Sequence, residues 1–372
     1  MDRVLIIDHK VATPDHDSGS LRMVNLIRVL DQLGWAITYL PQTWGDRRLR
    51  EELTQLAEAL QIDLAGERSV KRHLRQACRS YRAAVLCRPA PTERFLPSLR
   101  RYCPDTWCIF DTVDLHHLRE HRQSEIEGDR RLRASALELR QREHQLVRET
   151  DATVVVSPVE RDILLREVPD ARISVVPNIH SIAPPGPPFE ERSGLVFVAG
   201  FEHAPNIDAA VWLVDSIMPA VWRQLPEVAL HLVGSHPPTE IQELASPRVH
   251  VTGWVPEIEP YLTRSRLSVA PLRFGAGVKG KITQSMAVGL PAVATSLAAE
   301  GMPIEHERDI LIADRAVDLA DTIVHAYRDR ELWARLSAAG RENAGRNFSF
   351  GAARRSVGAL MGQIPACDRE DE

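Results

Sequence analysis

The stretch that decides the fold runs from Ala270 to Pro291 and reads APLRFGAGVKGKITQSMAVGLP. The short apolar run just before it, residues 267–270, predicts a strand that leads into a loop containing Gly275, Gly277 and Gly280. Two lysines close this loop, and the helical sequence ITQSMAV follows. Glycines let backbone N–H groups approach a ligand, and a helix N-terminus offers unpaired N–H groups and the positive end of its dipole. The combination predicts an anion site, with a phosphate or diphosphate as the expected anion.

Two other interpretations of the same loop stay open. A strand-to-helix turn can need glycines without binding anything, and the GxxxxGK[ST] spacing of a P-loop is absent. Gly275, Gly277 and Gly280 follow the spacing GxGxxG of a dinucleotide site. Such a site expects an acidic residue at the end of a strand about twenty positions later. Glu300 lies at that distance but within the loop sequence AAEGM, so it does not decide between the two.

Composition bounds the class of protein. The chain has 372 residues, enough for two domains, and 44% of them are apolar. Its net charge of −5 argues against a general nucleic-acid binder. We expect no signal peptide, because the first apolar run, VLII, is only four residues long, and no stretch approaches the length of a membrane span. These features predict a cytoplasmic protein.

The cysteines predict buried thiols. They are odd in number and scattered: Cys78, Cys87, Cys103, Cys108 and Cys367. Cys87 and Cys108 stand in apolar, strand-like runs, so a reducing compartment explains them best. A zinc site built from Cys103, Cys108, His116 and His117 is a weak alternative, because its spacing fits no known metal module. We therefore expect no metal.

Strands and helices alternate through the first half of the chain. Predicted strands begin at VLIID (4–8), AITYLP (36–41), AAVLCR (83–88), WCIFDTVD (107–114) and ATVVVS (152–157). Helical spacing appears at 21–33, 48–60 and 69–80. Alternation of this kind predicts a doubly wound α/β domain.

The segment Arg119–Glu149 predicts one long, solvated helix. Fifteen of its 31 residues are charged, and leucines recur every seven residues at 132, 139 and 146. We expect the helix to lie on the domain by this stripe, in preference to a coil that binds a partner.

The second half repeats the α/β alternation after a proline-rich linker, APPGPP (183–188). We predict a first domain at 1–182, a linker at 183–192 and a second domain at 193–350. Ligands of such sheets bind outside the carboxyl ends of the strands. Two facing sheets therefore predict a cleft between the domains.

The second domain resembles the GT-B glycosyltransferases, specifically glycosyltransferase family 4. The resemblance rests on FVAGFEHAPNIDAAVWL, LHLVGSHP, VHVTGWVPEIEPYL, the glycine-loop stretch and AAEGM, and more loosely on VVVSPVERDIL and VVPNIH in the first domain. It implies transfer of a sugar from a nucleotide diphosphate donor, with retention of configuration and without a metal or other cofactor. It also implies a helix at 351–364 that crosses back onto the first domain.

The resemblance assigns the second-domain site residue by residue. Lys279 and Lys281 would neutralise the donor diphosphate, and Gly277 would allow close backbone approach. The family carries two glutamates here, which align with Ala276 and Gln284, so both carboxylates are missing. Gln284 can still hydrogen-bond a ribose hydroxyl.

Two further donor contacts are predicted at strand ends. Glu300 is expected to contact the sugar or ribose, and His203 to act as a weak substitute for a basic residue that binds phosphate. We expect Asn206 to cap the helix that begins IDAAVWL.

The first domain supplies the opposite wall. His116 is expected to position the sugar or acceptor, with Asp114 supporting it; the alternative is that Asp114 caps a helix and His117 packs. Ser18 and Gly19, with Asp17, are expected in a small loop that lies over the diphosphate or the acceptor.

The expected partners are a nucleotide sugar and a glycan or lipid-linked acceptor, with no nucleic acid. Residues 46–101 hold thirteen Lys/Arg and seven Asp/Glu, so contact with an anionic membrane surface is an option beside an ordinary charged surface. Two rival functions stay open: a nucleotide-sugar epimerase of the same fold, and a degenerate module that binds sugar nucleotides or a partner. The missing glutamates favour the degenerate module.

Overall fold

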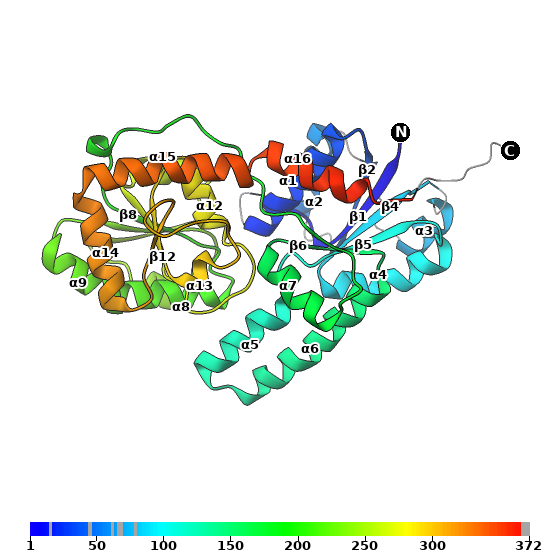
Figure 1. Ribbon diagram of the computed structural model, residues 1–372, viewed down its shortest axis with the longest axis horizontal. Coiled ribbons are helices and arrows are strands. Elements are labelled where there is room, and N and C mark those ends of the chain that lie inside the picture. Colours follow the sequence, from blue (N-terminus) through cyan, green and yellow to red (C-terminus); the bar gives the residue numbers. More distant parts are fainter. Residues whose placement is uncertain (15–16, 44–46, 61–62, 65–69, 78–79, 366–372) are drawn as a thin grey trace.

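The computed structural model describes residues 1–14, 17–43, 47–60, 63–64, 70–77 and 80–365. They form two α/β domains side by side, joined by an irregular connection and by two helices along one edge (Figure 1). Within these residues, no helix is both long enough and apolar enough to cross a membrane.

A parallel sheet with strand order β3-β2-β1-β4-β5-β6-β7 forms the centre of the first domain. The central strands are buried on both faces, as in β1, where residues 4–7 are fully buried. The strands are β1 (Arg3–Lys10), β2 (Ala36–Thr43), β3 (Asp63–Leu64), β4 (Ala83–Cys87), β5 (Trp107–Asp111), β6 (Ala152–Val155) and β7 (Ile173–Val175). The helices are α1 (Ser18–Gln32), α2 (Arg47–Leu60), α3 (Val70–Ala77), α4 (Pro89–Tyr102), α5 (His116–Glu127), α6 (Arg130–Glu149) and α7 (Pro158–Glu167).

The second domain repeats this plan with the order β10-β9-β8-β11-β12-β13. Its strands are β8 (Leu195–Val198), β9 (Leu230–Val233), β10 (Val249–Gly253), β11 (Leu267–Ala270), β12 (Ala292–Ala294) and β13 (Leu311–Ile312). Its helices are α8 (Ala204–Trp212), α9 (Met218–Gln224), α10 (Thr239–Gln242), α11 (Glu259–Arg264), α12 (Gly280–Ala287), α13 (Ser296–Ala299), α14 (Ala316–Arg328) and α15 (Arg330–Asn347). The predicted fold of two doubly wound domains facing each other is confirmed.

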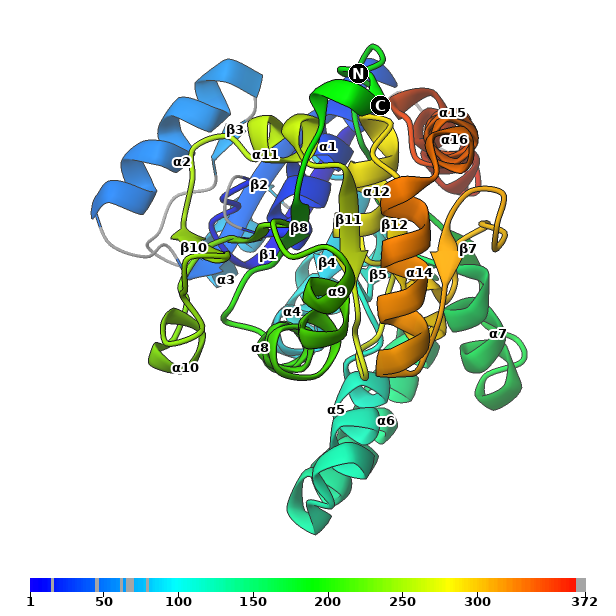
Figure 2. The same cartoon turned by 90° about the vertical axis from the view of Figure 1, so that its left-hand side faces the viewer.

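The prediction of one long helix over Arg119–Glu149 is wrong. Gly128 adopts a left-handed conformation (φ 69°), which ends α5, and the Asp129 carboxylate caps the first turn of α6. The two helices pack as a hairpin that projects from the body of the molecule (Figures 1 and 2). Of the leucine stripe, Leu146 is buried in the domain, whereas Leu132 and Leu139 are only half-buried along the hairpin.

The helix predicted after Asn206 is interrupted. Between α8 and α9 the chain makes a π-helical segment, Leu213–Ile217, just before Pro219. A proline in a helix interior removes one backbone hydrogen bond and crowds the preceding turn, and wider turns accommodate such disruption.

The last helix, α16 (Phe350–Met361), leaves the second domain and packs beside α1 of the first (Figure 1). Its side chains at positions 353, 357, 360 and 361 are buried in the apolar cluster beneath β1 and β4. The buried thiols of Cys87 and Cys108 are free, as predicted for the strands that carry them.

Candidate active site

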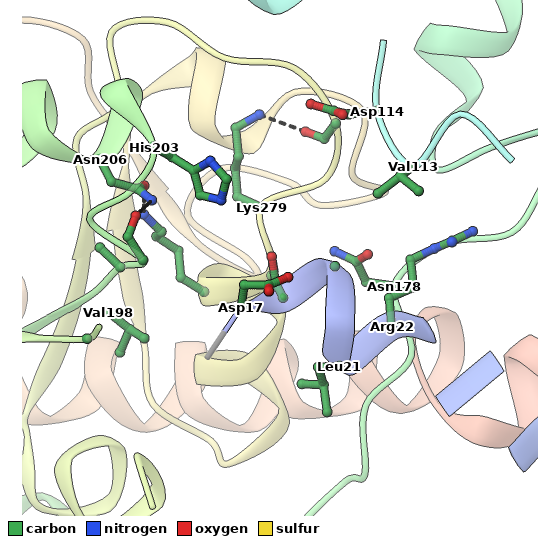
Figure 3. Close-up of a pocket in the computed structure, with 18 of the residues that line it drawn as sticks. Asp17, Leu21, Arg22, Val113, Asp114, Asn178, Val198, His203, Asn206 and Lys279 are labelled. Atoms are coloured by element: carbon green, nitrogen blue, oxygen red, sulfur yellow. Dashed lines mark hydrogen bonds between the residues drawn. The ribbon is translucent and has the colours of Figure 1, made fainter. Parts of the chain in front are cut away.

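The carboxyl ends of the two sheets meet around a cavity of about 630 Å³. Side chains of both domains gather around it, among them Asp17 and Asp114 of the first and His203 and Lys279 of the second (Figure 3). Nine of the ten predicted site residues line the cavity: Ser18, Gly19, Asp114, His116, His203, Gly277, Lys279, Lys281 and Gln284.

The N-termini of two helices meet at the wall of the cavity. Ser18 and Gly19, predicted in a loop, instead form the first turn of α1, and Asp17 caps it by accepting from Ser20 N at 2.7 Å. Gly280 begins α12 opposite, so close that a Cβ there would lie 2.9 Å from the Cβ of Ser18. Both dipoles therefore direct their positive ends toward the cavity.

Lys281 is a half-buried cation without a counter-ion. Its ammonium donates to Asn206 Oδ1 at 2.6 Å and lies 4.3 Å from the centre of the Phe197 ring. No carboxylate in the described part of the chain pairs with it. Burial, together with the charge of Lys279, lowers the pKa of Lys281 to about 7.

Lys279 holds the glycine loop from within. Its ammonium donates to the carbonyls of Ala276 and Gly277, at 2.6 and 2.7 Å, so the loop curls around it. Burial lowers the pKa of Lys279 to about 8, although the nearby carboxylates of Asp114 and Glu160 oppose this effect.

On the first-domain side, Asp114 and His116 form a pair. His116 Nε2 lies 3.1 Å from Asp114 Oδ1, and Arg119 contacts the other carboxylate oxygen. Burial would raise the pKa of Asp114, but the charges of Arg119 and His116 outweigh it and hold the pKa well below its usual range. Asp114 is therefore a carboxylate that orients His116 and not a proton donor.

Asp114 does not cap α5. The N-cap residue is Leu115, which makes no side-chain cap, and the carboxylate that serves this end is Glu143 of α6. Glu143 is fully buried and accepts from His116 N at 2.9 Å, from His117 N at 3.3 Å and from the His117 ring. His117 packs, as the alternative interpretation had it.

The other cations of the first-domain wall are paired. Lys10 lies 3.1 Å from Asp17, Arg88 lies 2.8 Å from Asp8, and Arg22 lies 2.6 Å from Asp111, fully buried. Sequence patterns gave no signal for these pairs, because the two members of each pair come from different elements of the domain.

The backbone is strained where β4 and β5 end. Arg88 (φ 71°) and Val113 (φ 65°) both adopt the left-handed region, which is costly for a β-branched residue, and both line the cavity. Strain of this kind clusters at functional sites because the surrounding structure must impose it.

Residues 192–329 match the family model of the glycosyl transferases group 1. The matched segment spans the second domain, from just before β8 to the end of α14. No curated protein matches the sequence significantly.

Solved glycosyltransferase structures share the fold over the whole chain. HepE of Anabaena, solved with UDP and glucose, is 12% identical with a TM-score of 0.71 and covers 98% of this chain and 100% of its own. TarM of S. aureus (10%, TM-score 0.74) covers 98% and 100%, and sucrose-phosphate synthase of Thermosynechococcus elongatus (16%, TM-score 0.70) covers 98% and 99%.

The second domain contributes cations but no carboxylate to the cavity wall. Ala276 and Gln284 both line the cavity, at the positions where the resemblance expects glutamates. The acidic residues of the wall, Asp17 and Asp114, both come from the first domain and are both paired.

Two predictions for the second domain do not hold geometrically. Glu300 does not line the cavity; its carboxylate binds Arg122 of the first domain. Asn206 does not cap α8, which begins at Ala204; it donates to Gly200 O at 2.8 Å and holds Lys281. Asn206 lies in the first turn of α8 and Glu300 directly follows α13, and each side chain binds a residue distant in the sequence.

The alternative zinc site does not assemble. Among the described residues, no three His, Cys, Asp or Glu side chains gather as a metal site requires. His117 points to Glu143, and Cys108 is buried on β5.

Proposed function

We propose that this protein transfers a sugar from a nucleotide diphosphate donor to a glycan or lipid-linked acceptor, with retention and without a metal. One observation carries the proposal: Lys281 presents a half-buried ammonium, with only neutral partners, to the cavity. A buried cation without a counter-ion is unfavourable, and an anionic ligand would relieve that cost.

The donor diphosphate fits the charges of the second-domain wall. When both are protonated, Lys279 and Lys281 would place two positive charges beside the N-terminus of α12, which match the two negative charges of a nucleotide sugar. Trp254, also in the wall and 42% exposed, offers an aromatic surface for the base. UDP is the first base to test, because HepE and TarM were both solved with UDP.

Transfer would then rest on electrostatics and exclusion of water. The lysines would stabilise the diphosphate as it leaves, which is the role a metal fills elsewhere. His116, oriented by Asp114, would position the sugar or the acceptor hydroxyl. The retention of configuration rests on the resemblance to family 4.

The acceptor is proposed to enter from the first-domain side. The basic segment 46–101 supports a lipid-linked acceptor only weakly, because Arg82, Arg88 and Arg100 are already paired with aspartates outside it. The acceptor panel should therefore contain free glycans and lipid-linked glycans in vesicles.

The test is substitution of Lys281. We expect Lys281→Ala to weaken binding of UDP-, GDP- or dTDP-sugars by about ten- to a hundred-fold, as loss of a charge-assisted contact implies. Isothermal titration with the donor that binds best, and release of its nucleotide, are the measurements. Arg308→Ala, in an exposed pair with Glu305, is the control.

The outcomes separate the rival functions. Unchanged donor affinity in Lys281→Ala would refute the proposed site. Binding without nucleotide release, with every acceptor supplied, would favour a degenerate module. Conversion of the donor sugar in the absence of an acceptor would favour an epimerase.

A further inference from the structure

Arg122 of α5 connects the two domains at the base of the glycine loop. Its guanidinium makes a two-pronged contact with the Glu300 carboxylate, at 2.7 and 2.8 Å, and a third bond to the carbonyl of Gly275 at 2.8 Å. All three contacts cross from the first domain to the second. Two-pronged arginine–carboxylate pairs are directional as well as strong.

This contact requires the domains to be closed. Next to Glu300, a Cβ on Gly301 would lie 2.7 Å from Ser157 Cβ, and one on Gly277 would lie 3.0 Å from Asp114 Cβ. Both glycines have positive φ, at 76° and 69°. The second-domain backbone thus lies directly against the first domain at Gly277 and at Gly301, and separation of the domains there would break the contacts of Arg122.

Arg122 also shares an element with the site. His116 at the beginning of α5 lines the cavity, and Arg122 lies on the same helix. That helix is held by the buried Glu143 of α6. A shift of the second domain relative to α5 would therefore change the shape of the cavity and the contacts of Arg122 together.

The carbonyl that Arg122 holds belongs to the loop that wraps Lys279. Gly275 precedes the two carbonyls, of Ala276 and Gly277, that accept from the Lys279 ammonium. Without a donor at Gly275, one end of this loop loses its attachment to the first domain. The loop conformation sets where Lys279 and the N-terminus of α12 stand.

We propose that Arg122 is a positioning residue. It binds Glu300 when the two domains are closed, and through the Gly275 carbonyl it holds the glycine loop in its anion-binding conformation. The closure step stands on geometry alone. The consequence for the donor rests on the proposed function.

The first experiment needs no ligand. Hydrogen–deuterium exchange of the full chain should show faster exchange in residues 272–281 for Arg122→Ala than for the wild type. Arg122→Lys, which keeps one donating nitrogen, should recover part of the protection against exchange. Glu300→Gln should lose less protection than Arg122→Ala. Arg140→Ala, on the same hairpin but paired with Glu167 inside the first domain, is the matched control.

The second experiment measures turnover with the nucleotide sugar that binds the wild type best. We expect kcat/KM for the donor to fall on the order of ten- to a hundred-fold in Arg122→Ala, as small misplacements of binding groups do. Part of this fall should be a rise in the donor KM, with the acceptor KM unchanged. A general loss of folded enzyme would instead lower the apparent kcat and leave both KM values as they are. Arg122→Lys should be intermediate.

The outcomes keep the two proposals apart. Unchanged exchange at 272–281 in both Arg122→Ala and Glu300→Gln would overturn the role of Arg122, whatever the enzyme does. Faster exchange with unaltered donor kinetics would overturn its link to the donor. If no nucleotide sugar binds the wild type, the proposed function fails while the exchange result still decides the closure role.

Discussion

At the scale of single residues, the chemistry is concentrated in Lys281. Its charge is stabilised by an amide oxygen and an aromatic face, which are weaker partners than a carboxylate. Burial therefore brings its pKa to about 7, within the physiological range. An anionic ligand would raise that pKa again, because it supplies the missing opposite charge.

Donor binding should therefore depend on pH. Above pH 7 the free protein loses the Lys281 proton, so a donor must bind it back, and the Kd of a nucleotide sugar should rise by roughly tenfold per pH unit up to pH 9. Titration calorimetry between pH 6 and 9 measures this. The slope should flatten in Lys281→Met, and a flat wild-type profile would show that the site does not use this proton.

Gly277 is the residue where backbone and interface requirements coincide. Gly277→Ala should cost about 1–2 kcal/mol of stability from its left-handed φ alone. The added Cβ should also press on Asp114 and hinder closure, so turnover should fall.

The control for this change is Gly128→Ala. Gly128 has the same φ of 69° but open space around it, so the variant should lose similar stability and keep its activity. Thermal unfolding and donor turnover are compared side by side. Equal turnover in the two variants would contradict the close approach of Gly277 to Asp114.

At the scale of elements, the hairpin of α5 and α6 is the part of the fold that the sequence pattern predicted least well. A buried carboxylate on α6 serves the N-terminus of α5, so the two helices are held together at the end next to the cavity. The free end projects away from both domains (Figure 2). The hairpin thus anchors His116 and Arg122 on one rigid support.

Glu143→Gln should loosen this support. We expect a loss of about 3 kcal/mol in the free energy of unfolding, because the buried contact with His117 and two backbone N–H groups is weakened. Chemical denaturation measures it, and Glu138→Gln, exposed on the same helix, should change little. A loss in the free energy of unfolding no larger than that of Glu138→Gln would mean that α5 does not depend on Glu143.

At the scale of the whole molecule, the last helix of the chain packs against the N-terminal domain. α15 lies on the second domain and α16 on the first, along one edge that both domains share (Figure 1). The C-terminal segment therefore completes the core of the N-terminal domain.

Leu360→Ala should destabilise the first domain by about 2–4 kcal/mol, although it lies at the far end of the sequence. Slower-exchanging amides of β1 and β4 should lose protection while those of β11 keep it. Leu137→Ala, at a 52% exposed position, is the control. Protection lost only in the second domain would contradict the assignment of α16.

The sequence by itself determined the fold class, the strand ends and most of the cavity wall. Apolar runs that alternate with segments of helical spacing leave few alternatives to a parallel sheet. Ligands of such a sheet bind outside the carboxyl ends of its strands, so the residues that follow the strands are the candidates for the site. Lys279, Lys281, Gly277, Gln284 and His203 all line the cavity: the glycine loop pointed to the two lysines, and the resemblance to family 4 pointed to the other three. Their roles stay predictions.

Only the tertiary structure decided which partner each polar side chain takes. Glu300 binds Arg122, Asn206 holds Lys281, and Glu143 caps α5, and each pair is distant in sequence. A strand end brings a side chain to the right edge of a sheet, but its final hydrogen bond depends on what the facing domain presents there. Burial makes those partners obligatory, because an unpaired polar group in a closed interface is costly.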